Sequence, residues 1–272
     1  MKLIAIGDSV CDCYIEENIF FPGGNCYNVA VHAKRCGAEE TSYTGVLGDD
    51  YMADYLTECL EKEGVKAENC RRMYAASAQT GVKLVNGDRV FVAIQPYSCQ
   101  KIAAIKITAK DLELAKTADV CHISCYSNLE YELETLAKAV ALSFDFSEIK
   151  DDGYFKKVCP HLTYAFLSGS GLSDDECKAL AQKLHSLGTK NVCITQGSKG
   201  SFFSDGQNFY RHGIVKVEVV DTMGAGDSYI AAFLVHYTEN KDVPKAMEAA
   251  AAYAAHNCTK RGAIGYAHTL SI

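Results

Sequence analysis

The 272-residue sequence lacks the features that mark membrane proteins, secreted proteins and nucleic-acid-binding proteins. No apolar run reaches the roughly 18 residues that a membrane-spanning helix requires, so no membrane partner is expected. The apolar stretch at residues 3–6 is too short for a signal peptide and ends close to Asp8. The 27 basic and 34 acidic residues give a formal net charge of −7 without a dense Lys/Arg run, which argues against a nucleic-acid partner. We therefore expect a cytoplasmic protein.

Prolines, linkers and repeats are also scarce. The chain has only four prolines and neither an internal repeat nor a low-complexity tract. At about 150 residues per domain, its length fits one large domain, or one with a small appendage. Hydrophobic residues make up 48% and charged residues 22%, which is typical of a globular protein with a full core. We expect one domain over residues 1–272.

The thirteen cysteines include no Cys-x-x-Cys pair, and their odd number does not suit a disulfide framework. Cys11 with Cys13, and Cys121 with Cys125, could form metal or redox pairs. No histidine lies at zinc-ligand spacing from them, and cysteine also packs well as a small buried residue. We favour reduced, buried thiols, and we interpret the eight histidines as packing or surface residues.

Short apolar runs alternate with segments whose apolar residues recur every three or four positions. The first pattern is typical of buried strands and the second of amphipathic helices. Ser173 followed by Glu176 forms a capping-box signature, which predicts the start of a helix. The alternation predicts an α/β fold with a mostly parallel sheet covered by helices on both faces. The expected strands are residues 2–6, 41–46, 119–123, 140–146, 162–167 and 191–195, and the expected helices are residues 25–36, 50–62, 130–139, 173–187, 224–237 and 243–260.

Two segments, about residues 10–22 and 65–97, break this rhythm because they are rich in extended sequence without a helix-length pattern. Residues 81–85 and 89–94 flank Asn86-Gly87-Asp88, and Asn-Gly is a strong signal for a hairpin turn. These segments predict a small β-sheet that projects from the α/β body. Such a sheet could be a lid that closes over a substrate, which we favour, or a strand pair at an interface.

The most informative sequence is Asp221-Thr222-Met223-Gly224-Ala225-Gly226-Asp227, between a predicted strand and an apolar helix. Glycines let a ligand approach the backbone, and free amide hydrogens at a helix N-terminus attract anionic oxygen. We expect the amides of Gly224, Ala225 and Gly226 to form an anion hole. Asp227 would follow in the first helical turn, where its carboxylate could accept a proton from a hydroxyl. In the alternative interpretation, Asp227 only caps the helix.

Two further loop-to-helix junctions carry a resemblance to a known family. They are Gly23-Gly24-Asn25-Cys26-Tyr27-Asn28 and Gly45-Val46-Leu47-Gly48-Asp49-Asp50. Together with residues 221–227, these motifs resemble the signatures of the ribokinase-like sugar kinases, also called the phosphofructokinase B family, from Ile4 to about Gly265. The resemblance implies a ribokinase-like central, mostly parallel sheet with a small β-sheet lid. It also implies transfer of the γ-phosphate of ATP, with Mg²⁺ on its phosphates, to a hydroxyl of a small sugar.

The resemblance assigns roles to single residues. Asp227 would be the catalytic base, and residues 224–226 would stabilise the transferred phosphoryl group. These roles suit phosphoryl transfer, which depends on positioning and charge neutralisation. Asp12 could instead be a solvated strand-end carboxylate, and Asn28 a packing residue. The implied sugar-binding residues are Asp12, Gly23, Gly24 and Asn28.

The nucleotide site is expected at residues 195–200, which resemble the family's Thr-x-Gly-x-x-Gly loop. Thr195, Gly197 and Gly200 would contact ATP, although the same loop could be an ordinary turn. Asn257, after an alanine-rich helix, matches a position beside the adenine, and that helix could equally serve tight packing. The resemblance also makes Asp221 a possible site for a monovalent cation such as K⁺.

One departure concerns magnesium. Many family members have Asn-x-x-Glu after the strand before the nucleotide site, where this chain has Leu167-Ser168-Gly169-Ser170-Gly171-Leu172-Ser173. The usual Glu is missing, so the protein contacts of Mg²⁺ stay open, and Asp145 or Asp221 could contribute through water. The same glycines are not a dinucleotide fingerprint, because the third glycine is absent.

Within the family, residues 7–12, 21–25, 143–147 and 260–263 resemble the fructoselysine 6-kinases. This implies phosphorylation of the 6-hydroxyl of fructoselysine or a related fructosamine. Asp8 could then meet the amino group, unless it is a structural strand-end residue.

Several alternatives to this function remain open at this point. The chain could be another sugar or nucleoside kinase of the family, or a sugar- or nucleotide-binding protein without activity. An NAD-dependent oxidoreductase is disfavoured because Gly-x-Gly-x-x-Gly is missing after the first predicted strand. No Walker motif is present either. The small sheet could also join two subunits in a homodimer.

Overall fold

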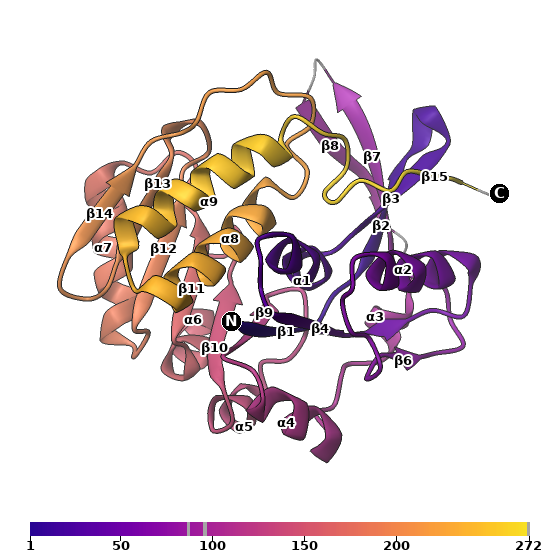
Figure 1. The fold of residues 1–272 in the computed structure, drawn as a ribbon, viewed down its shortest axis with the longest axis horizontal. Coiled ribbons are helices and arrows are strands. Elements are labelled where there is room, and N and C mark those ends of the chain that lie inside the picture. Colours follow the sequence, from indigo (N-terminus) through magenta and orange to yellow (C-terminus); the bar gives the residue numbers. More distant parts are fainter. Residues whose placement is uncertain (86–87, 95–96, 271–272) are drawn as a thin grey trace.

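The computed structural model describes residues 1–85, 88–94 and 97–270. Within these residues, eight strands form a large central sheet (Figure 1). In spatial order they are β14 (Phe209–His212), β13 (Ser201–Ser204), β12 (Asn191–Thr195), β11 (Tyr164–Ser168), β10 (Ala141–Asp145), β9 (Val120–Ser124), β1 (Lys2–Ile6) and β4 (Glu40–Thr44). The strands from β12 to β4 are parallel, and β13 and β14 extend one edge in antiparallel pairing.

Helices cover both faces of the large sheet. Alternate residues of β1 show this, because Leu3 and Ala5 belong to one buried hydrophobic cluster whereas Ile4 and Ile6 belong to another. Strands buried on both faces are typical of parallel sheets, so the predicted α/β fold is confirmed. The helices on the first cluster are α1 (Asn25–Arg35), α2 (Tyr51–Lys62), α8 (Ala225–Asn240) and α9 (Val243–Asn257), and those on the second are α3 (Cys99–Ile102), α4 (Ala109–Lys116), α5 (Leu133–Ala137), α6 (Asp152–Val158) and α7 (Asp174–Ser186).

Most predicted elements form close to the expected positions. β1 and β12 have the predicted bounds, and the capping box of Ser173 and Glu176 begins α7. The expected helix 130–139 is shorter as α5, and α4 and α6 were not predicted, because helices of eight and seven residues are too short to reveal a period. In the part of the chain that the structure describes, no helix is both long and apolar enough to span a bilayer. Short 3₁₀ turns occur at η1 (Ile15–Glu17), η2 (Cys159–His161) and η3 (Gly197–Lys199).

A small sheet projects from this body (Figure 1). Its strands, in spatial order, are β15 (His268–Thr269), β3 (Ile19–Gly23), β2 (Val10–Tyr14), β7 (Gln79–Val85) and β8 (Asp88–Ile94). β7 and β8 pair in antiparallel fashion, whereas the predicted turn at Asn86-Gly87 lies outside the described residues. β15 joins from near the C-terminus, which the sequence pattern did not predict.

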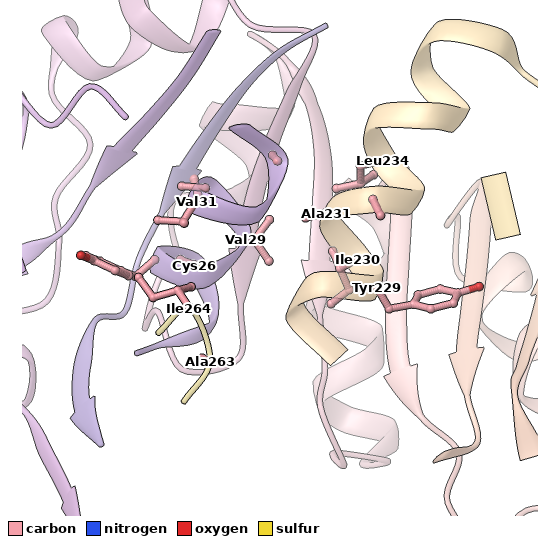
Figure 2. Close-up of a cluster of buried hydrophobic side chains, with 14 of the residues drawn as sticks. Cys26, Val29, Val31, Tyr229, Ile230, Ala231, Leu234, Ala263 and Ile264 are labelled. Carbon is pink, nitrogen blue, oxygen red and sulfur yellow. The ribbon is translucent and has the colours of Figure 1, made fainter. Parts of the chain in front are cut away.

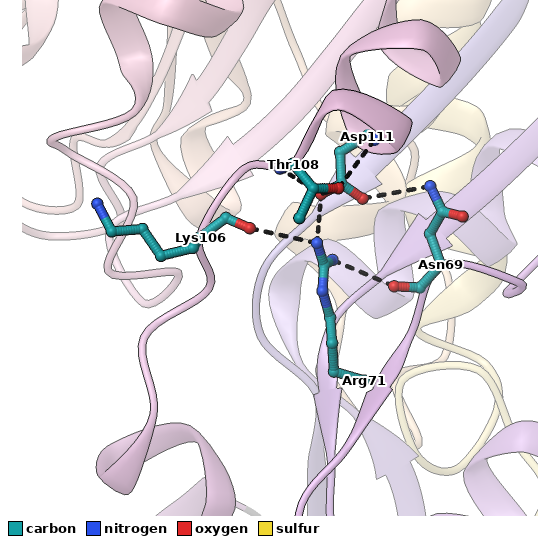
Figure 3. A network of polar contacts seen from close by, with 5 residues as sticks. All are labelled: Asn69, Arg71, Lys106, Thr108 and Asp111. Carbon is teal, nitrogen blue, oxygen red and sulfur yellow. Dashed lines mark hydrogen bonds and ion pairs between the residues drawn. The ribbon is translucent and has the colours of Figure 1, made fainter.

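The predicted segment 65–97 belongs only in part to the small sheet. β6 (Arg71–Arg72) instead pairs with β5 (Val46–Leu47) in a separate two-stranded sheet. Arg71 fixes β6 on the body, because its guanidinium donates to the carboxylate of Asp111 and to two backbone carbonyls (Figure 3). The observed strand of the small sheet in this region therefore begins at Gln79 and not at residue 65.

Two buried helices form the support of the loop at residues 221–227. α8 buries the continuous run 228–235, as expected for a helix inside a core. Figure 2 shows Val29 of α1 and Ile230 of α8 on the facing sides of these two helices. The packing fixes the first turns of α1 and α8 near the carboxyl ends of the parallel strands, where α/β proteins bind their ligands.

Candidate active site

Two adjoining cavities open near these helix N-termini. The acidic cavity, of about 500 Å³, has four carboxylates in its lining, from Asp12, Asp145, Glu148 and Asp227. The apolar cavity, of about 630 Å³, has in its lining three alanines of α9 and the side chains of Ile214, Val215, Val217 and Val219. The predicted anion-hole loop lies where the two cavities meet. The residues that line both are Thr195, Gly197, Thr222, Ala225 and Gly226.

The two glycines of this loop serve different purposes. Gly224 has a φ of 70°, and a Cβ there would lie 2.7 Å from the Cβ of Ala263. A Cβ at Gly226 would meet no atom within 4 Å, so this glycine leaves open space beside both cavities. The first N–H groups of α8 have no acceptor within the helix and therefore favour an anion. Ala225 differs from the prediction, because its N–H donates to the carbonyl of Thr222 at 3.2 Å.

Asp227 lies in the first turn of α8 and lines the acidic cavity. Its Oδ1 accepts a hydrogen bond from Asn25 Nδ2 at 2.8 Å, and its Oδ2 accepts one from Asn28 Nδ2 at 2.7 Å. Burial raises the pKa of Asp227 to about 7; the charges of Asp145 and Asp8 add to the rise, and the two amides oppose it. A carboxylate with a pKa near neutrality is well matched to general base catalysis.

The loop before α1 forms another wall of the acidic cavity. Gly24 has a φ of 103°, and a Cβ there would lie 2.6 Å from Ser9 Cα. A Cβ at Gly23 would lie 2.3 Å from Asp12 Oδ2. Asn28 Oδ1 is buried without a hydrogen-bond partner in the described residues, so it is available to a donor in the cavity. The structure thus brings together the predicted sugar-binding residues Asp12, Gly23, Gly24 and Asn28.

Asp8 has a different position from the one expected for a substrate contact. It does not line the acidic cavity as the structure describes it. Its Oδ2 accepts from the backbone N–H of Asn25 at 2.5 Å, and its Oδ1 accepts from Ser124 Oγ at 2.7 Å. The carboxylate therefore satisfies a free N–H group at the start of α1, which is the structural alternative that the sequence left open.

The predicted nucleotide loop borders the apolar cavity. β12 ends at Thr195, and Thr195, Gly197 and Gly200 all line this cavity. Gly200 has a φ of 95°, and a Cβ there would lie 2.1 Å from the carbonyl oxygen of His212. The small side chains of Ala251, Ala254 and Ala255 leave an apolar wall on α9, which suits a flat aromatic base.

Asn257 does not face the apolar cavity in the described structure. Its side chain is buried, and its Nδ2 donates to the carbonyl of Met223 at 3.2 Å. The residue therefore braces the loop before α8, in place of the predicted adenine contact.

Asp221 is also buried, and its carboxylate faces hydrogen-bond donors. Oδ2 accepts from Tyr14 Oη at 2.6 Å and from Gly262 N at 3.0 Å, and Oδ1 accepts from Met223 N at 2.9 Å. The three donors occupy most of the roughly four lone-pair positions of the carboxylate, so they would compete with a K⁺ ion bound directly by Asp221. The carboxylate instead connects β2 of the small sheet to the loop before α8.

Asn25 was not predicted as a site residue, and Asp145 was predicted only as a possible contact to Mg²⁺ through water. Asn25 bridges two carboxylates, because its Nδ2 also donates to Asp145 Oδ2 at 2.9 Å. Burial raises the pKa of Asp145 to about 6, and the charge of Asp8 acts in the same direction. The available signals were an asparagine inside the Gly-Gly motif and a carboxylate at the end of an apolar strand.

Comparison with known proteins decides which family contains this chain. The family model described as pfkB family carbohydrate kinase matches residues 5–151 and 161–270. The chain belongs to this family. Membership makes it a carbohydrate kinase, a phosphotransferase that uses an alcohol group as acceptor, and it confirms the family predicted from the glycine and aspartate motifs.

Relatives in the pfkB family match the chain over nearly its whole length. It is 42% identical over 269 residues to the fructosamine kinase FrlD of Bacillus subtilis (strain 168), which covers 98% of this chain and 94% of that protein. It is 35% identical over 266 residues to the fructoselysine 6-kinase of Escherichia coli (strain K12), with coverage of 97% and 100%. The solved structure of Arabidopsis thaliana ribokinase complexed with ribose and ATP aligns with a TM-score of 0.82 at 22% identity, over 96% of this chain and 94% of that one. This last likeness shows the ribokinase-like fold.

Proposed function

We propose that the protein transfers the γ-phosphate of ATP to the 6-hydroxyl of a fructosamine, a fructose whose first carbon carries an amine such as the side chain of lysine. The observation that carries the proposal is the position of Asp227, in the acidic cavity and beside the helix N-terminus that both cavities share. The apolar cavity suits adenine, the helix N-terminus suits phosphate, and the acidic cavity suits a hydroxylated cation.

The chemistry follows from this arrangement. Asp227 accepts the proton of the substrate hydroxyl while the hydroxyl oxygen attacks the γ-phosphorus. The new O–P bond forms as the bond between the γ-phosphorus and the bridging oxygen of ADP breaks. The N–H groups at the start of α8 stabilise the charge on the phosphoryl group during transfer. Mg²⁺ enters as part of the MgATP substrate and shares the phosphate charge.

The lining of the acidic cavity favours a cationic sugar. Among its described lining residues are four carboxylates and no Lys, Arg or His side chain. Phe91 and Tyr126 also line it, and both are more than half exposed, at 57% and 56%. A secondary ammonium group would be attracted by the carboxylates and by the aromatic rings. The names of the relatives, fructosamine kinase and fructoselysine 6-kinase, support the same substrate class.

A substrate panel tests this proposal. The protein would be incubated with MgATP and with fructoselysine, fructose, ribose or a nucleoside separately. We expect the highest kcat/KM with fructoselysine and a product phosphorylated on O6, as read by NMR. Glu148→Gln, which removes one carboxylate without changing the size of the side chain, should raise KM for fructoselysine more than for fructose. Turnover confined to fructose, ribose or nucleosides would overturn the substrate assignment.

We propose further that the small sheet is a lid and a dimer contact. Asp12 on β2 and Phe91 on β8 both line the acidic cavity, so movement of this sheet would change access to it. β8 is an edge strand of the described sheet, and Val90, Phe91 and Val92 are exposed on it. A second copy would cover these side chains, and light scattering at increasing concentration should detect a dimer. We also propose a cytoplasmic location, because all thirteen cysteines are free thiols, which suits a reducing compartment.

A further inference from the structure

One buried histidine lies next to the reaction site and has no role in the chemistry above. His122 is on β9 and is 0% exposed. Its Nε2 lies 2.9 Å from Asn25 Oδ1, and its Nδ1 lies 2.9 Å from Ser143 Oγ. A buried ring with both nitrogens engaged is held in one orientation.

The directions of these hydrogen bonds follow from the chemistry of the groups. The nitrogen of the Asn25 amide faces two carboxylate oxygens, so its two hydrogens go to Asp227 and Asp145. The amide oxygen can only accept, and therefore His122 Nε2 carries a proton. Burial lowers the pKa of His122 to about 3, so the ring is neutral and its Nδ1 accepts from Ser143.

We infer that Ser143, His122 and Asn25 form a neutral hydrogen-bonded relay that positions the carboxylate of Asp227 and holds it beside that of Asp145. This inference rests on the proposed role of Asp227 as the base. Neither Ser143 nor His122 lines the acidic cavity in the described structure, so they act on the reaction only through Asn25.

The relay matters because the surroundings of Asp227 are negative. Asp145 and Asp8 act on its carboxylate, and Asp12 and Glu148 line the same cavity; the described lining contains no basic side chain. The groups that oppose protonation of Asp227 are the amides of Asn25 and Asn28. Hydrogen bonds in a chain polarise one another, so His122 and Ser143 strengthen the donor at Asn25. Loss of the relay should therefore raise the pKa of Asp227 and also free its side chain to rotate.

The test compares pH profiles of kcat for variants along the relay. Asn25→Leu removes the donor, and we expect kcat to fall about tenfold to a hundredfold with the acidic limb shifted upward by about one pH unit. KM for the sugar should change less than kcat. His122→Leu should shift the limb in the same direction, whereas His122→Gln, whose amide nitrogen can replace Nε2, should restore most of the loss. The phosphates of MgATP gain and lose protons in the same way in every assay. Differences between the pH profiles of the variants therefore arise from the protein.

A matched control is available in His32. This residue is also 0% exposed, and its ring nitrogens contact Tyr253 Oη and the carbonyl of Ala263, away from the relay. His32→Leu should affect thermal stability without moving the acidic limb. Ser143→Ala, a small change, supplies a second relay variant if His122→Leu fails to fold, and it should shift the limb slightly upward.

The outcomes separate this inference from the proposed function. Full turnover by Asp227→Asn would show that Asp227 is not the base, and it would overturn the proposed function. If Asp227→Asn is inactive while folded Asn25→Leu and Ser143→Ala keep the parental pH profile, the relay is only structural and the inference is overturned. The relay is likewise only structural if His122→Gln is no more active than His122→Leu when both fold.

Discussion

The helix pair α1 and α8 and the small sheet both border the acidic cavity, but they are built differently. α1 buries residues 25–33 and α8 buries residues 228–235, so packing holds both helices, while the first turn of α8 faces the cavities. The small sheet instead presents exposed apolar side chains on its edge strand β8. We infer that the groups that perform the reaction lie where the fold resists displacement, and that recognition uses a part with fewer contacts to hold it in place.

Replacement of the base should have the largest effect. Asp227→Asn keeps the size of the side chain but removes the proton acceptor, and general base catalysis contributes about 10²-fold to 10⁴-fold. We expect kcat to fall by that order while the dissociation constant for the sugar, measured by calorimetry, changes little. Asp242→Asn is a control, since Asp242 caps α9 on the surface and Asn also caps helices. An unchanged kcat in Asp227→Asn would show that the general base is not Asp227 and that the proton acceptor lies outside the helix pair.

The two glycines of the loop offer the next test. Gly224→Ala would force a side chain into positive φ and against Ala263, so we expect a loss of about 1 to 3 kcal/mol in the free energy of unfolding together with a loss of activity. Gly226→Ala has room for its methyl group and should unfold at the parental temperature. That methyl would nevertheless occupy space beside the phosphate position and raise KM for MgATP. Equal stability of both variants would show that the loop is not held as tightly as its contacts indicate.

The regular elements of the body could be predicted from the sequence, and the polar contacts at the site could be predicted only in part. β1 and β12 are apolar runs bounded by polar residues, so their bounds are local properties. The position of Asn28 follows from the Gly-Gly motif. Asp8 was ambiguous because a strand-end carboxylate can bind a ligand or cap a helix, and only the three-dimensional course of α1 decides between them.

The pairing of β6 and the position of His122 depend on contacts that are distant in sequence. Arg71 meets Asp111 across 40 residues, and His122 meets Asn25 across 97 residues. An isolated arginine or histidine in the sequence carries no sign of such a partner. Long-range polar contacts therefore set the limit of what a single sequence predicts at this site.

The hydrogen-bond network around Asp111 tests whether a contact in the α/β body can contribute to stability without affecting kcat. Asp111 is 1% exposed and accepts from Thr108, Asn69 and Arg71 (Figure 3). Asp111→Ala should lower the free energy of unfolding by about 1 to 3 kcal/mol, because buried donors lose their acceptor. kcat at a temperature where the variant is folded should not change. A large loss of kcat in the folded variant would contradict the separation of the two roles.

The same carboxylate gives a pH dependence with a defined sign. Burial acts to raise the pKa of Asp111, but the hydrogen bonds from Thr108 and the charge of Arg71 outweigh it, and the net shift is downward. A folded-state pKa below the unfolded value means that the contribution to stability is present above the unfolded pKa of about 4 and is lost as the pH falls through the folded pKa. Denaturant melts between neutral and acidic pH should show this loss in the parent and less of it in Asp111→Ala.

The link between the small sheet and the loop before α8 should give a moderate effect. Tyr14→Phe removes the hydroxyl that donates to Asp221 but keeps the ring, which packs against Phe21. A hydrogen bond to a charged group contributes about 1.5 to 3 kcal/mol to stability. Because Asp221 retains donors from Met223 and Gly262, we expect the free energy of unfolding of Tyr14→Phe to fall by the lower part of this range. KM for the sugar should rise more than kcat falls, because the small sheet is assigned to recognition. A fall in kcat alone would contradict that assignment.

Exchange of monovalent cations should have the smallest effect. The resemblance makes Asp221 a possible K⁺ site. In the structure, its carboxylate already accepts hydrogen bonds from Tyr14, Gly262 and Met223. A cation at this carboxylate would face hydrogen atoms that carry partial positive charge, and displacement of Tyr14 would also cut the link to the small sheet. Replacement of K⁺ by Na⁺ at constant ionic strength leaves the screening of charges unchanged, so kcat should stay within about twofold. Strong activation by K⁺ that disappears in Asp221→Asn would instead mean that the loop before α8 rearranges to admit the ion. Only the helix pair, and not this loop, would then be held rigidly by packing.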